Sequence, residues 1–377
     1  MQNSNKTFCF VTNLSFGKEP TVKNRLIPYI TQIIECGSSV ILVTSDSEVY
    51  KDIDSNLFTH ILNPSKKNKP SSFFGRTIFE WIEARNILMR VKKIDAEIII
   101  LTIPSMFLLF NAYLLKSENM YLDVRDLTWE YLSNKNLIHR ASKLFFRLLV
   151  NRSIKFFNSI IVSNDEEADF FKKRGAKTQL YPNGVTQIQF ENLSSLLEKK
   201  NSNFTVSYVG KVGLAQNLET LIGAAKIMND IKFNIIGYGS EYSRLQNIVL
   251  SKGLTNIAFY KNANWEEVLH FYQESDVLYA QLQENYSGAM PSKLYQYLNT
   301  GRFVIYGGGN QAKKTLSNFS TNIVIPPCNI HKLVDAIKKV RELHIQKIDI
   351  NNNLKIIKQN YIRENNVRKI IKECFKI

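Results

Sequence analysis

The stretch Tyr208-Val-Gly-Lys-Val-Gly-Leu-Ala-Gln-Asn-Leu218 decides the fold of the second half of the chain. It follows an apolar strand-like run, Thr205–Val209, and leads into an amphipathic helical pattern that begins at about Leu218. In open α/β sheets, a glycine-rich turn of this kind presents backbone N–H groups and a helix N-terminus to an anion. The stretch therefore predicts a phosphate-binding turn at the edge of a parallel sheet.

Two more turns of this kind lie downstream. Gly237-Tyr-Gly-Ser240 follows a strand-like run, and Tyr286-Ser-Gly-Ala-Met-Pro-Ser-Lys293 opens a helical pattern at Ser292–Thr300. Strand and helix patterns alternate through this half, which predicts a parallel sheet with right-handed crossovers. The predicted strands are Thr205–Val209, Phe233–Ile236, Ile257–Tyr260, Val277–Ala280, Phe303–Tyr306 and Ile323–Ile325. Three turns at the carboxyl ends of such strands predict one ligand site.

The first half shows the same alternation. Its predicted strands are Thr7–Thr12, Ile41–Thr44, Ile98–Leu101, Met120–Val124 and Ser159–Ser163. A chain of 377 residues is too long for one ordinary core and fits two domains. We predict an α/β protein with two Rossmann-like domains, at 1–187 and 188–350, joined by a polar linker at Thr186–Asn203. A basic helical tail at 351–377 is expected to pack back toward the first domain.

Composition and charge limit the partners. The formal net charge of +16 calls for an anionic partner, which nucleic acid, an anionic membrane surface or phosphorylated substrates would each provide. A general enrichment in Lys, Asn and Ile would also explain this charge without any functional patch. The four cysteines are scattered and the five histidines lie far apart, so we expect no disulfide framework, no metal and no cofactor.

The N-terminus and the apolar runs predict the location. Residues 1–6 are polar and lack a signal-peptide pattern. The only membrane-like run, Ile98–Leu115, contains Pro104, Ser105 and Asn111, and is better explained as a strand, a turn and a buried helix. We therefore expect a cytoplasmic protein, peripheral at the inner face of the cytoplasmic membrane.

Two polar stretches follow predicted strands of the first domain. The loop after the first strand, Asn13–Pro20, is either a ligand contact or a plain surface loop, and it lacks the GxGxxG dinucleotide pattern. The second stretch places Asp123, Arg125, Asp126 and Glu130 just beyond a buried strand. Buried charges must pair with one another or with a ligand, so this cluster is either part of an active site or a structural ion-pair network.

The segment 137–157 is the most basic amphipathic stretch of the chain. Large apolar residues alternate there with cations, namely Leu144, Phe145, Leu148, Leu149 and Phe156 with His139, Arg140, Lys143, Arg147, Arg152 and Lys155. A helix of this composition suits an anionic lipid surface. Equally, it could pack on its domain and expose a solvated basic face.

The second domain supplies the candidate phosphate-binding residues. Gly210 and Gly213 allow a sharp turn and close approach to an anion, while Lys211 and Gln216 add a charged and a neutral donor. The backbone at Gly237, Tyr238 and Gly239 is a candidate contact for a nucleotide base. The third turn contributes Gly288, Ala289, Ser292 as a helix N-cap, Lys293 and Gln296.

This layout resembles the GT-B glycosyltransferases, and in detail their large retaining GT4 family. The resemblance covers nearly the whole chain and rests on the loop Asn13–Pro20, Asp123-Val-Arg-Asp-Leu127, Pro182-Asn-Gly-Val185, Val209–Leu218, Ile236-Gly-Tyr-Gly239 and Pro291-Ser-Lys-Leu-Tyr-Gln-Tyr-Leu298. It implies two domains that face each other across a cleft. The Gly-Leu-Ala-Gln and Pro-Ser-Lys pieces look like the bacterial surface-polysaccharide subgroup, which includes L-fucosamine-type transferases.

Several positions depart from the family pattern. The resemblance places Arg and Lys on the diphosphate, where this chain has Lys211 and Gln216. Two family glutamates, eight positions apart, correspond to Gly288 and Gln296. Gln296 can bond a ribose hydroxyl but cannot act as a carboxylate, and Lys293 is the candidate that compensates at the anion site.

The resemblance implies that the enzyme transfers a sugar from a UDP-sugar to a polyprenyl-linked saccharide acceptor, with retention and without a metal. Such a reaction belongs to O-antigen, capsule or exopolysaccharide synthesis, and the sugar could be an N-acetylated deoxyhexose. Lys211, Lys293 and Asp126 are the expected catalytic residues, with Asp126 orienting the acceptor. The remaining acceptor contacts are expected at Asn13, Phe16, Gly17, Arg125 and Glu130.

Two other functions remain open. A GT-B epimerase would act on a free UDP-sugar without any acceptor. A nucleic-acid-binding protein would show a basic stripe with exposed aromatic residues, whereas the aromatic residues here fall mostly in core patterns, so we expect no nucleic acid as partner.

Overall fold

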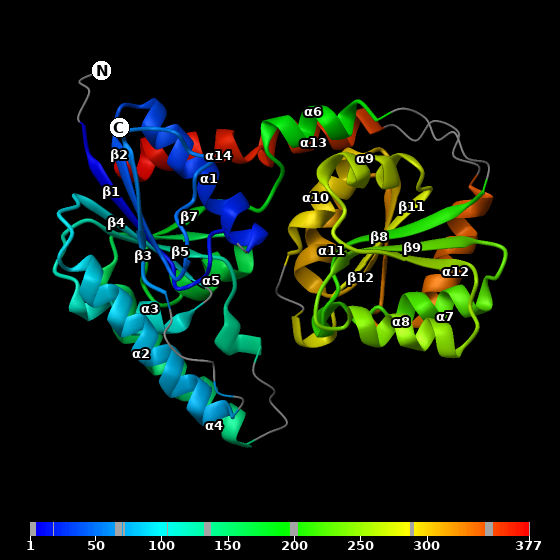
Figure 1. Ribbon diagram of the computed structural model, residues 1–377, viewed down its shortest axis with the longest axis horizontal. Helices are drawn as coiled ribbons and strands as arrows, with labels where there is room; N and C mark the ends of the chain where they lie inside the picture. The colour runs from blue at the N-terminus through cyan, green and yellow to red at the C-terminus, as the bar shows by residue number, and fades with distance from the viewer. Residues whose placement is uncertain are drawn as a thin grey trace. The chain divides into compact units, whose positions relative to one another are not determined.

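The computed structural model describes residues 5–17, 19–64, 70, 72–103, 105–131, 137–196, 203–286, 290–343 and 350–376. The chain divides into two compact units, one of Met1–Pro182 with Arg363–Ile377 and one of Asn183–Ile362. Each unit is a parallel sheet with helices on both faces (Figure 1). The α/β prediction is therefore confirmed.

The first unit contains a sheet of seven strands in the order β3-β2-β1-β4-β5-β6-β7. The strands are β1 (Thr7–Val11), β2 (Ser39–Thr44), β3 (Phe58–Leu62), β4 (Ile98–Ile103), β5 (Met120–Val124), β6 (Ser159–Val162) and β7 (Thr178–Leu180). Because helices cover both faces, the central strands are almost continuously apolar, as Ile98-Ile-Ile-Leu-Thr-Ile103 shows. The sequence did not predict β3, whose residues Phe58-Thr-His-Ile-Leu62 mix polar and apolar side chains.

The helices of the first unit pack in two layers. One layer consists of α1 and α14. Helix α14 leads the end of the chain into the core, where the ring of Phe375 packs against that of Phe8. The other layer contains α2, α3, α4 and α5. The helices are α1 (Pro20–Glu35), α2 (Phe73–Val91), α3 (Met106–Phe110), α4 (Leu137–Ser153), α5 (Asp165–Lys172) and α14 (Arg363–Ile370).

The second unit contains a sheet of six strands in the order β10-β9-β8-β11-β12-β13. The strands are β8 (Thr205–Lys211), β9 (Lys232–Tyr238), β10 (Ile257–Tyr260), β11 (Val277–Gln281), β12 (Phe303–Gly307) and β13 (Asn322–Ile325). All six correspond to predicted strands. The central position of β8 places the glycine-rich turn at the point where the strand order reverses, where ligands of open α/β sheets bind.

Helices cover this second sheet as well. They are α6 (Gln187–Ser194), α7 (Glu219–Ile227), α8 (Tyr242–Ser251), α9 (Trp265–Gln273), α10 (Ser292–Asn299), α11 (Asn310–Leu316), α12 (Ile330–Glu342) and α13 (Ile350–Asn360). The linker prediction at Thr186–Asn203 is wrong for its first half, because α6 occupies it. Thr186 and Gln189 form a reciprocal capping box that starts this helix.

Candidate functional site

The turn after β8 can form only because glycines stand at its close contacts. Gly237, on the neighbouring strand, has φ of +147°, and a Cβ there would lie 1.7 Å from the carbonyl oxygen of Gly210. A Cβ on Gly210 would lie 1.4 Å from Nζ of Lys293. No other residue type fits these two positions without moving the backbone or the lysine. The glycines therefore bring the ends of β8 and β9 together and make room for the lysine.

Lys293 lies in the first turn of α10, and the end of its side chain fills the space where a Cβ on residue 210 would stand. Its ammonium group donates a hydrogen bond of 2.6 Å to the carbonyl oxygen of Val209 and lies 5.7 Å from the ring centre of Tyr208. The hydroxyl of Tyr297 contacts the same residue, because it accepts a 2.9 Å hydrogen bond from the N–H of Val209 and donates one of 3.0 Å to the carbonyl oxygen of Val209. Burial lowers the pKa of Lys293 to about 7. An anion at this point would supply the counter-charge that this ammonium group needs.

The other predicted residues of this turn take different positions. Lys211 ends β8 and is exposed, while Gln216 is half-buried in a 3₁₀ turn, Leu214–Gln216. A surface pocket of about 220 Å³ lies beside the turn, lined by Gly213, Leu214, Asn217, Leu218, Glu219, Glu241, Arg244, Leu245 and Gln283. Arg244, which the sequence did not single out, pairs there with Glu219 at 2.7 Å and Glu241 at 2.6 Å.

The structure describes the second glycine turn in full and the third only in part. Tyr238 is half-exposed, and its carbonyl oxygen accepts a 2.8 Å hydrogen bond from the N–H of Val212, which ties the β9 turn to the β8 turn. Ser292 does not cap α10, because Pro291 holds the N-cap position and Ser292 begins the helix. Gln296 accepts a 3.2 Å hydrogen bond from the hydroxyl of Tyr272. Gly288 and Ala289 lie outside the described residues.

In the first unit, the loop after β1 is bound by a carboxylate of the chain itself. Asp46 accepts hydrogen bonds from the N–H groups of Phe16 and Gly17 at 2.7 and 3.2 Å, and from the hydroxyls of Ser15 and Thr44. Although burial opposes it, these hydrogen bonds lower the pKa of Asp46. The ring of Phe16 is fully buried, so it belongs to the core of the unit. An internal anion thus holds the amides of this loop.

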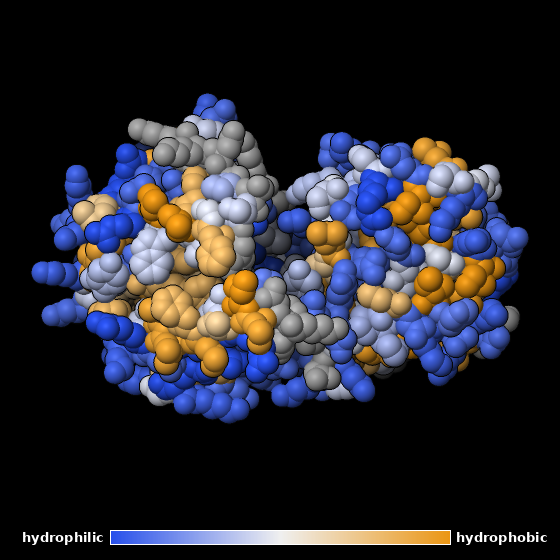
Figure 2. Space-filling view, turned by 90° about the horizontal axis from the view of Figure 1, so that it is seen from below, coloured by the Kyte–Doolittle hydropathy of each residue, from blue (hydrophilic) through white to orange (hydrophobic). Residues whose placement is uncertain are grey.

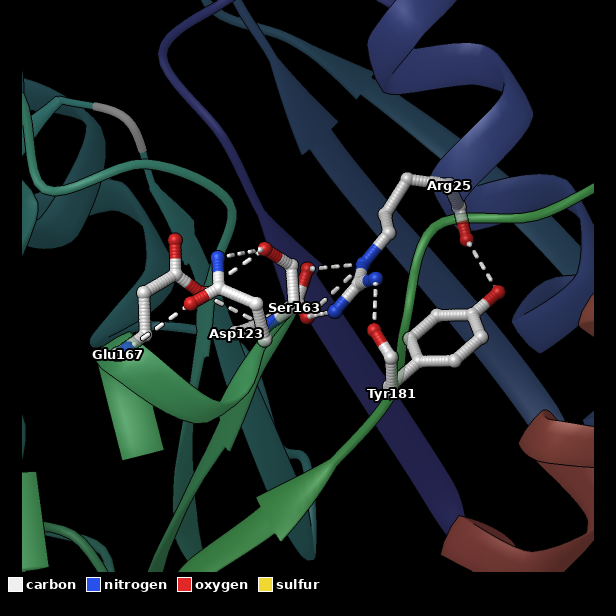
Figure 3. Close-up of polar contacts among 6 residues, drawn as sticks. Arg25, Asp123, Ser163, Glu167 and Tyr181 are labelled. Carbon is white, nitrogen blue, oxygen red and sulfur yellow. Dashed lines mark hydrogen bonds and ion pairs between the residues drawn. The ribbon is translucent and has the colours of Figure 1, made fainter. Parts of the chain in front are cut away.

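The acidic cluster after β5 begins with a buried ion pair (Figure 3). Arg25 reaches from α1 to Asp123, with Nη2 at 2.6 Å and Nε at 3.1 Å from Oδ1, and both side chains are almost fully buried. The guanidinium also donates to the carbonyl oxygen of Tyr181 at 2.5 Å and stacks over that ring at 3.8 Å. Asp123 is therefore a structural residue that joins α1, β5 and the chain after β7.

Glu130 is paired in the same way. Arg147 of α4 holds its carboxylate with two hydrogen bonds of 2.8 and 2.6 Å, and Nζ of Lys143 lies 3.8 Å away. The structural ion-pair interpretation thus describes Asp123 and Glu130. Arg125 and Asp126, which are half-buried, take part in neither of these two ion pairs.

Four buried polar atoms gather along the carboxyl ends of the adjacent strands β1, β4 and β5. Within the described part of the chain, no hydrogen-bond partner exists for Oδ1 of Asn13, Oγ1 of Thr102, Oγ of Ser105 and Nη1 of Arg125. Thr102 stands directly opposite Asp123 in the sheet register. Buried polar groups without partners commonly mark functional sites or ordered water. The sequence predicted Asn13 and Arg125, and missed Thr102 in β4 and Ser105 just before α3, because a single hydroxyl at such a position carries no signal of its own.

Glu167, at the start of α5, is the unusual titratable group of this region. Its Oε2 accepts hydrogen bonds from the N–H and hydroxyl of Ser163 at 2.7 and 2.9 Å (Figure 3). Burial, followed by the negative charge of Asp126, raises the pKa of Glu167 to about 8. This carboxyl group therefore keeps its proton at neutral pH.

The described residues contain no group of three His, Cys, Asp or Glu side chains that could hold a metal ion. None of the described helices has the length and apolar character that crossing a membrane requires.

Comparison with known families identifies the second unit. Residues 189–363 match the family described as Glycosyl transferases group 1. The chain carries a glycosyltransferase group 1 domain. This domain contains the glycine turns after β8 and β9 and Lys293, so the predicted donor residues that the structure describes all lie within it. A search of curated proteins finds no match.

Solved structures resemble the whole chain. Sucrose-phosphate synthase from Thermosynechococcus elongatus has a TM-score of 0.74 and 14% identity over 97% of both chains. HepE from Anabaena in complex with UDP-glucose has a TM-score of 0.70 and 13% identity over 99% of this chain and 100% of that one. WaaG, a glycosyltransferase involved in lipopolysaccharide biosynthesis, has a TM-score of 0.66 and 14% identity over 98% and 99%. With the glycosyltransferase domain, these similarities confirm the predicted GT-B fold and the glycosyltransferase class.

Proposed function

We propose that this glycosyltransferase moves a sugar from a UDP-sugar to a lipid-linked saccharide in bacterial surface-polysaccharide synthesis, with retention of configuration. The observation that carries the proposal is Lys293, whose desolvated ammonium group crosses Gly210 beside a glycine turn of a glycosyltransferase group 1 domain. HepE, of the same fold, binds UDP-glucose. WaaG, also of this fold, acts in lipopolysaccharide biosynthesis. An N-acetylated deoxyhexose is the first donor sugar to test.

In this proposal the second unit neutralises the leaving diphosphate. Lys293 and Lys211 supply positive charge and Gln216 a neutral donor, which stabilises the charge that develops on the departing phosphate. The backbone of Gly237–Gly239 contacts the base and Gln296 a ribose hydroxyl. No metal takes part in this scheme.

In the first unit, Asn13 and Arg125 bind the acceptor and Asp126 orients its hydroxyl group. The partnerless buried atoms along β1, β4 and β5 support this location. Glu130 contributes indirectly, because its ion pair with Arg147 ties the acceptor-side turn to α4.

We further propose that α4 binds the cytoplasmic face of an anionic membrane, where a polyprenyl-linked acceptor would be found. Leu144, Phe145 and Leu148 are 62%, 55% and 68% exposed, so the apolar side of α4 is not packed on the unit. Helix α2 adds exposed Phe74 and Ile78. Figure 2 shows apolar side chains gathered on this face of the first unit, with hydrophilic residues around them.

Helices α2 and α4 belong to one surface because both pack on α3. The ring of Phe107 on α3 lies 5.8 Å from Trp81 of α2 and 6.4 Å from Phe146 of α4, measured between ring centres. Arg140 and Arg152 are exposed on α4 beside its apolar side chains. Apolar residues flanked by cations are what an anionic interface attracts.

Transfer is tested with a panel of UDP-sugars and a polyprenyl-diphosphate-linked saccharide as acceptor. We expect a glycosylated lipid product, with Lys293→Ala and Lys211→Ala both strongly impaired. If both variants keep the full rate, the diphosphate assignment is wrong. Donor isomerisation without acceptor would instead indicate an epimerase, and a salt-dependent gel shift with RNA or DNA would indicate a nucleic-acid-binding protein.

Membrane binding is tested by co-sedimentation with vesicles. The wild type is expected to sediment with vesicles that contain anionic phosphatidylglycerol and much less with neutral phosphatidylcholine. The double variant Leu144→Ser/Leu148→Ser should lose this binding. The matched control is Leu250→Ser, because Leu250 is 71% exposed on α8 of the second unit and should not contribute. Equal sedimentation of wild type and double variant would contradict the proposal.

A further inference from the structure

Four consecutive carbonyl groups of the turn after β8, at residues 214–217, accept hydrogen bonds from a single segment. That segment is Gln281-Leu-Gln283, at the end of β11. Gln283 holds the first two carbonyls, through its side-chain amide at 2.6 Å and its backbone N–H at 2.9 Å. The Nε2 group of Gln281 holds the last two, at 3.0 and 2.9 Å. The segment thus fixes the direction of every peptide in the turn.

The Gln281 amide has one possible orientation. Its side chain is almost fully buried, and Oε1 accepts hydrogen bonds from the N–H of Cys328 at 2.7 Å and the hydroxyl of Tyr279 at 2.8 Å. A backbone N–H can only donate and the carbonyls of the turn can only accept, so exchanging Oε1 and Nε2 would break bonds on both sides. This amide therefore joins the turn after β8 rigidly to the turn after β13.

The segment Gln281-Leu-Gln283 bonds only to carbonyl groups of the turn, so the N–H groups of the turn stay available for a ligand. Within the described chain, the N–H groups of Gly213, Leu214 and Ala215 have no hydrogen-bond partner. Successive backbone N–H groups of a turn can form a concave binding site for an anion. Gly213, Leu214 and Gln283 also line the pocket beside the turn.

We propose that Gln281 and Gln283 are positioning residues, which hold the turn so that three successive N–H groups meet the diphosphate of the nucleotide donor. Neither side chain has to touch the ligand, because both act through the carbonyls of the turn. The inference rests on the proposed function, and it adds the part of the structure that preorganises the anion site.

The test is calorimetric titration of the full chain with UDP and with uridine. Gln281→Met keeps the length of the side chain and removes the amide. We expect its affinity for UDP to fall about tenfold, while its affinity for uridine, which lacks phosphate, stays unchanged. Gln283→Met loses only one of the two bonds made by that residue, so a smaller loss in the same direction is expected.

Asn256→Leu is the matched control. In the wild type, the Nδ2 group of Asn256 also donates to three carbonyl oxygens, those of Ala225, Met228 and Ile231, at 2.9, 2.9 and 3.1 Å. These bonds lie before β10, at the opposite end of the sheet from the turn. Asn256→Leu should lower the thermal midpoint and leave the affinity for UDP unchanged.

The outcomes separate this inference from the proposed function. If the wild type binds UDP and both glutamine variants bind it equally well, the positioning role is wrong and the proposed function stands. Equal weakening of UDP and uridine would indicate general loosening and would also overturn the inference. If the wild type does not bind UDP, the proposed function itself fails. Should Gln281→Met not fold, the milder Gln283→Met gives the same comparison.

Discussion

The carboxyl edges of the two sheets differ in how their polar groups are paired. We call the edge of the first sheet the paired edge and that of the second sheet the open edge. At the first edge, the chain binds three of its own carboxylates: Arg25 pairs with Asp123, Arg147 pairs with Glu130, and the loop amides of Phe16 and Gly17 donate to Asp46. At the second edge, the backbone N–H groups of residues 213–215 have no partner in the described chain. There, the buried ammonium group of Lys293 donates to the carbonyl oxygen of Val209 and has no ion-pair partner among the described residues.

This difference indicates where a large anion can be accepted. An edge whose charges are already paired gains little from an added phosphate, because existing ion pairs would have to be broken. At an edge with available N–H donors and a desolvated ammonium group, a bound phosphate makes new hydrogen bonds and a new ion pair without breaking existing ones. The second unit is therefore suited to the diphosphate donor, and the first to a ligand recognised by a few polar groups.

The largest expected effect is on the paired edge. Arg25→Met leaves Asp123 charged and buried without its partner, which should cost about 3–5 kcal/mol of unfolding free energy. Urea unfolding of the full chain measures it. Lys23→Met, two residues earlier on α1, is the control, because its ion pair with Asp52 is screened by solvent and should contribute little to the free energy of unfolding. Comparable losses for the two variants would contradict the paired-edge account.

The next effect is on the open edge. Lys293→Met removes a desolvated cation, and we expect the affinity for UDP to fall about 10- to 100-fold with folding preserved. Isothermal titration measures it, with Lys252→Met, an exposed lysine after α8, as control. An unchanged affinity would show that the diphosphate binds elsewhere.

The same lysine predicts a pH dependence. Since its pKa is about 7, the ammonium group loses its proton as the pH rises through neutrality. The diphosphate of UDP-glucose stays ionised, so its affinity should be constant below pH 7 and fall above it. Lys293→Met should give a flat profile between pH 6 and 9, and a wild-type profile that is already flat would contradict the assignment.

A further effect concerns the pH dependence of stability at the first edge. Glu167 has a pKa of about 8 in the folded chain against an ordinary value of 4.5, so the folded state binds the extra proton between these pH values. The contribution of Glu167 to the free energy of unfolding is therefore lost as the pH rises from about 5 to 8. Glu167→Gln should reduce the fall in thermal midpoint over this range, and Asp169→Asn, on the same helix, should leave it unchanged. An identical slope for Glu167→Gln would be inconsistent with a protonated Glu167.

The sequence predicted the features that depend on local pattern. Apolar runs such as Ile98–Leu101 and Val277–Ala280 located the strands, and glycines located the turns. It could not show pairs that join distant parts of the chain, such as Arg25 with Asp123 or Gln281 with Asn217. The same limit explains why Asp123 and Glu130 were left undecided, since only the three-dimensional structure reveals their partners.

Local patterns also failed where polarity misled. The polar passage after Val185 predicted a linker, yet Thr186 and Gln189 form the capping box of α6. Ser292 has the chemistry of an N-cap, but Pro291 already holds that position and fixes the start of α10. A polar residue that ends an apolar strand, as Gln281 does, was the available signal for the positioning segment.

A crystal structure of the full chain with UDP tests the central claim most directly. We predict that oxygens of the diphosphate lie within hydrogen-bond distance of the N–H groups of residues 213–215 and of Nζ of Lys293. A diphosphate bound away from this turn, with Lys293 still on the carbonyl of Val209, would contradict the account.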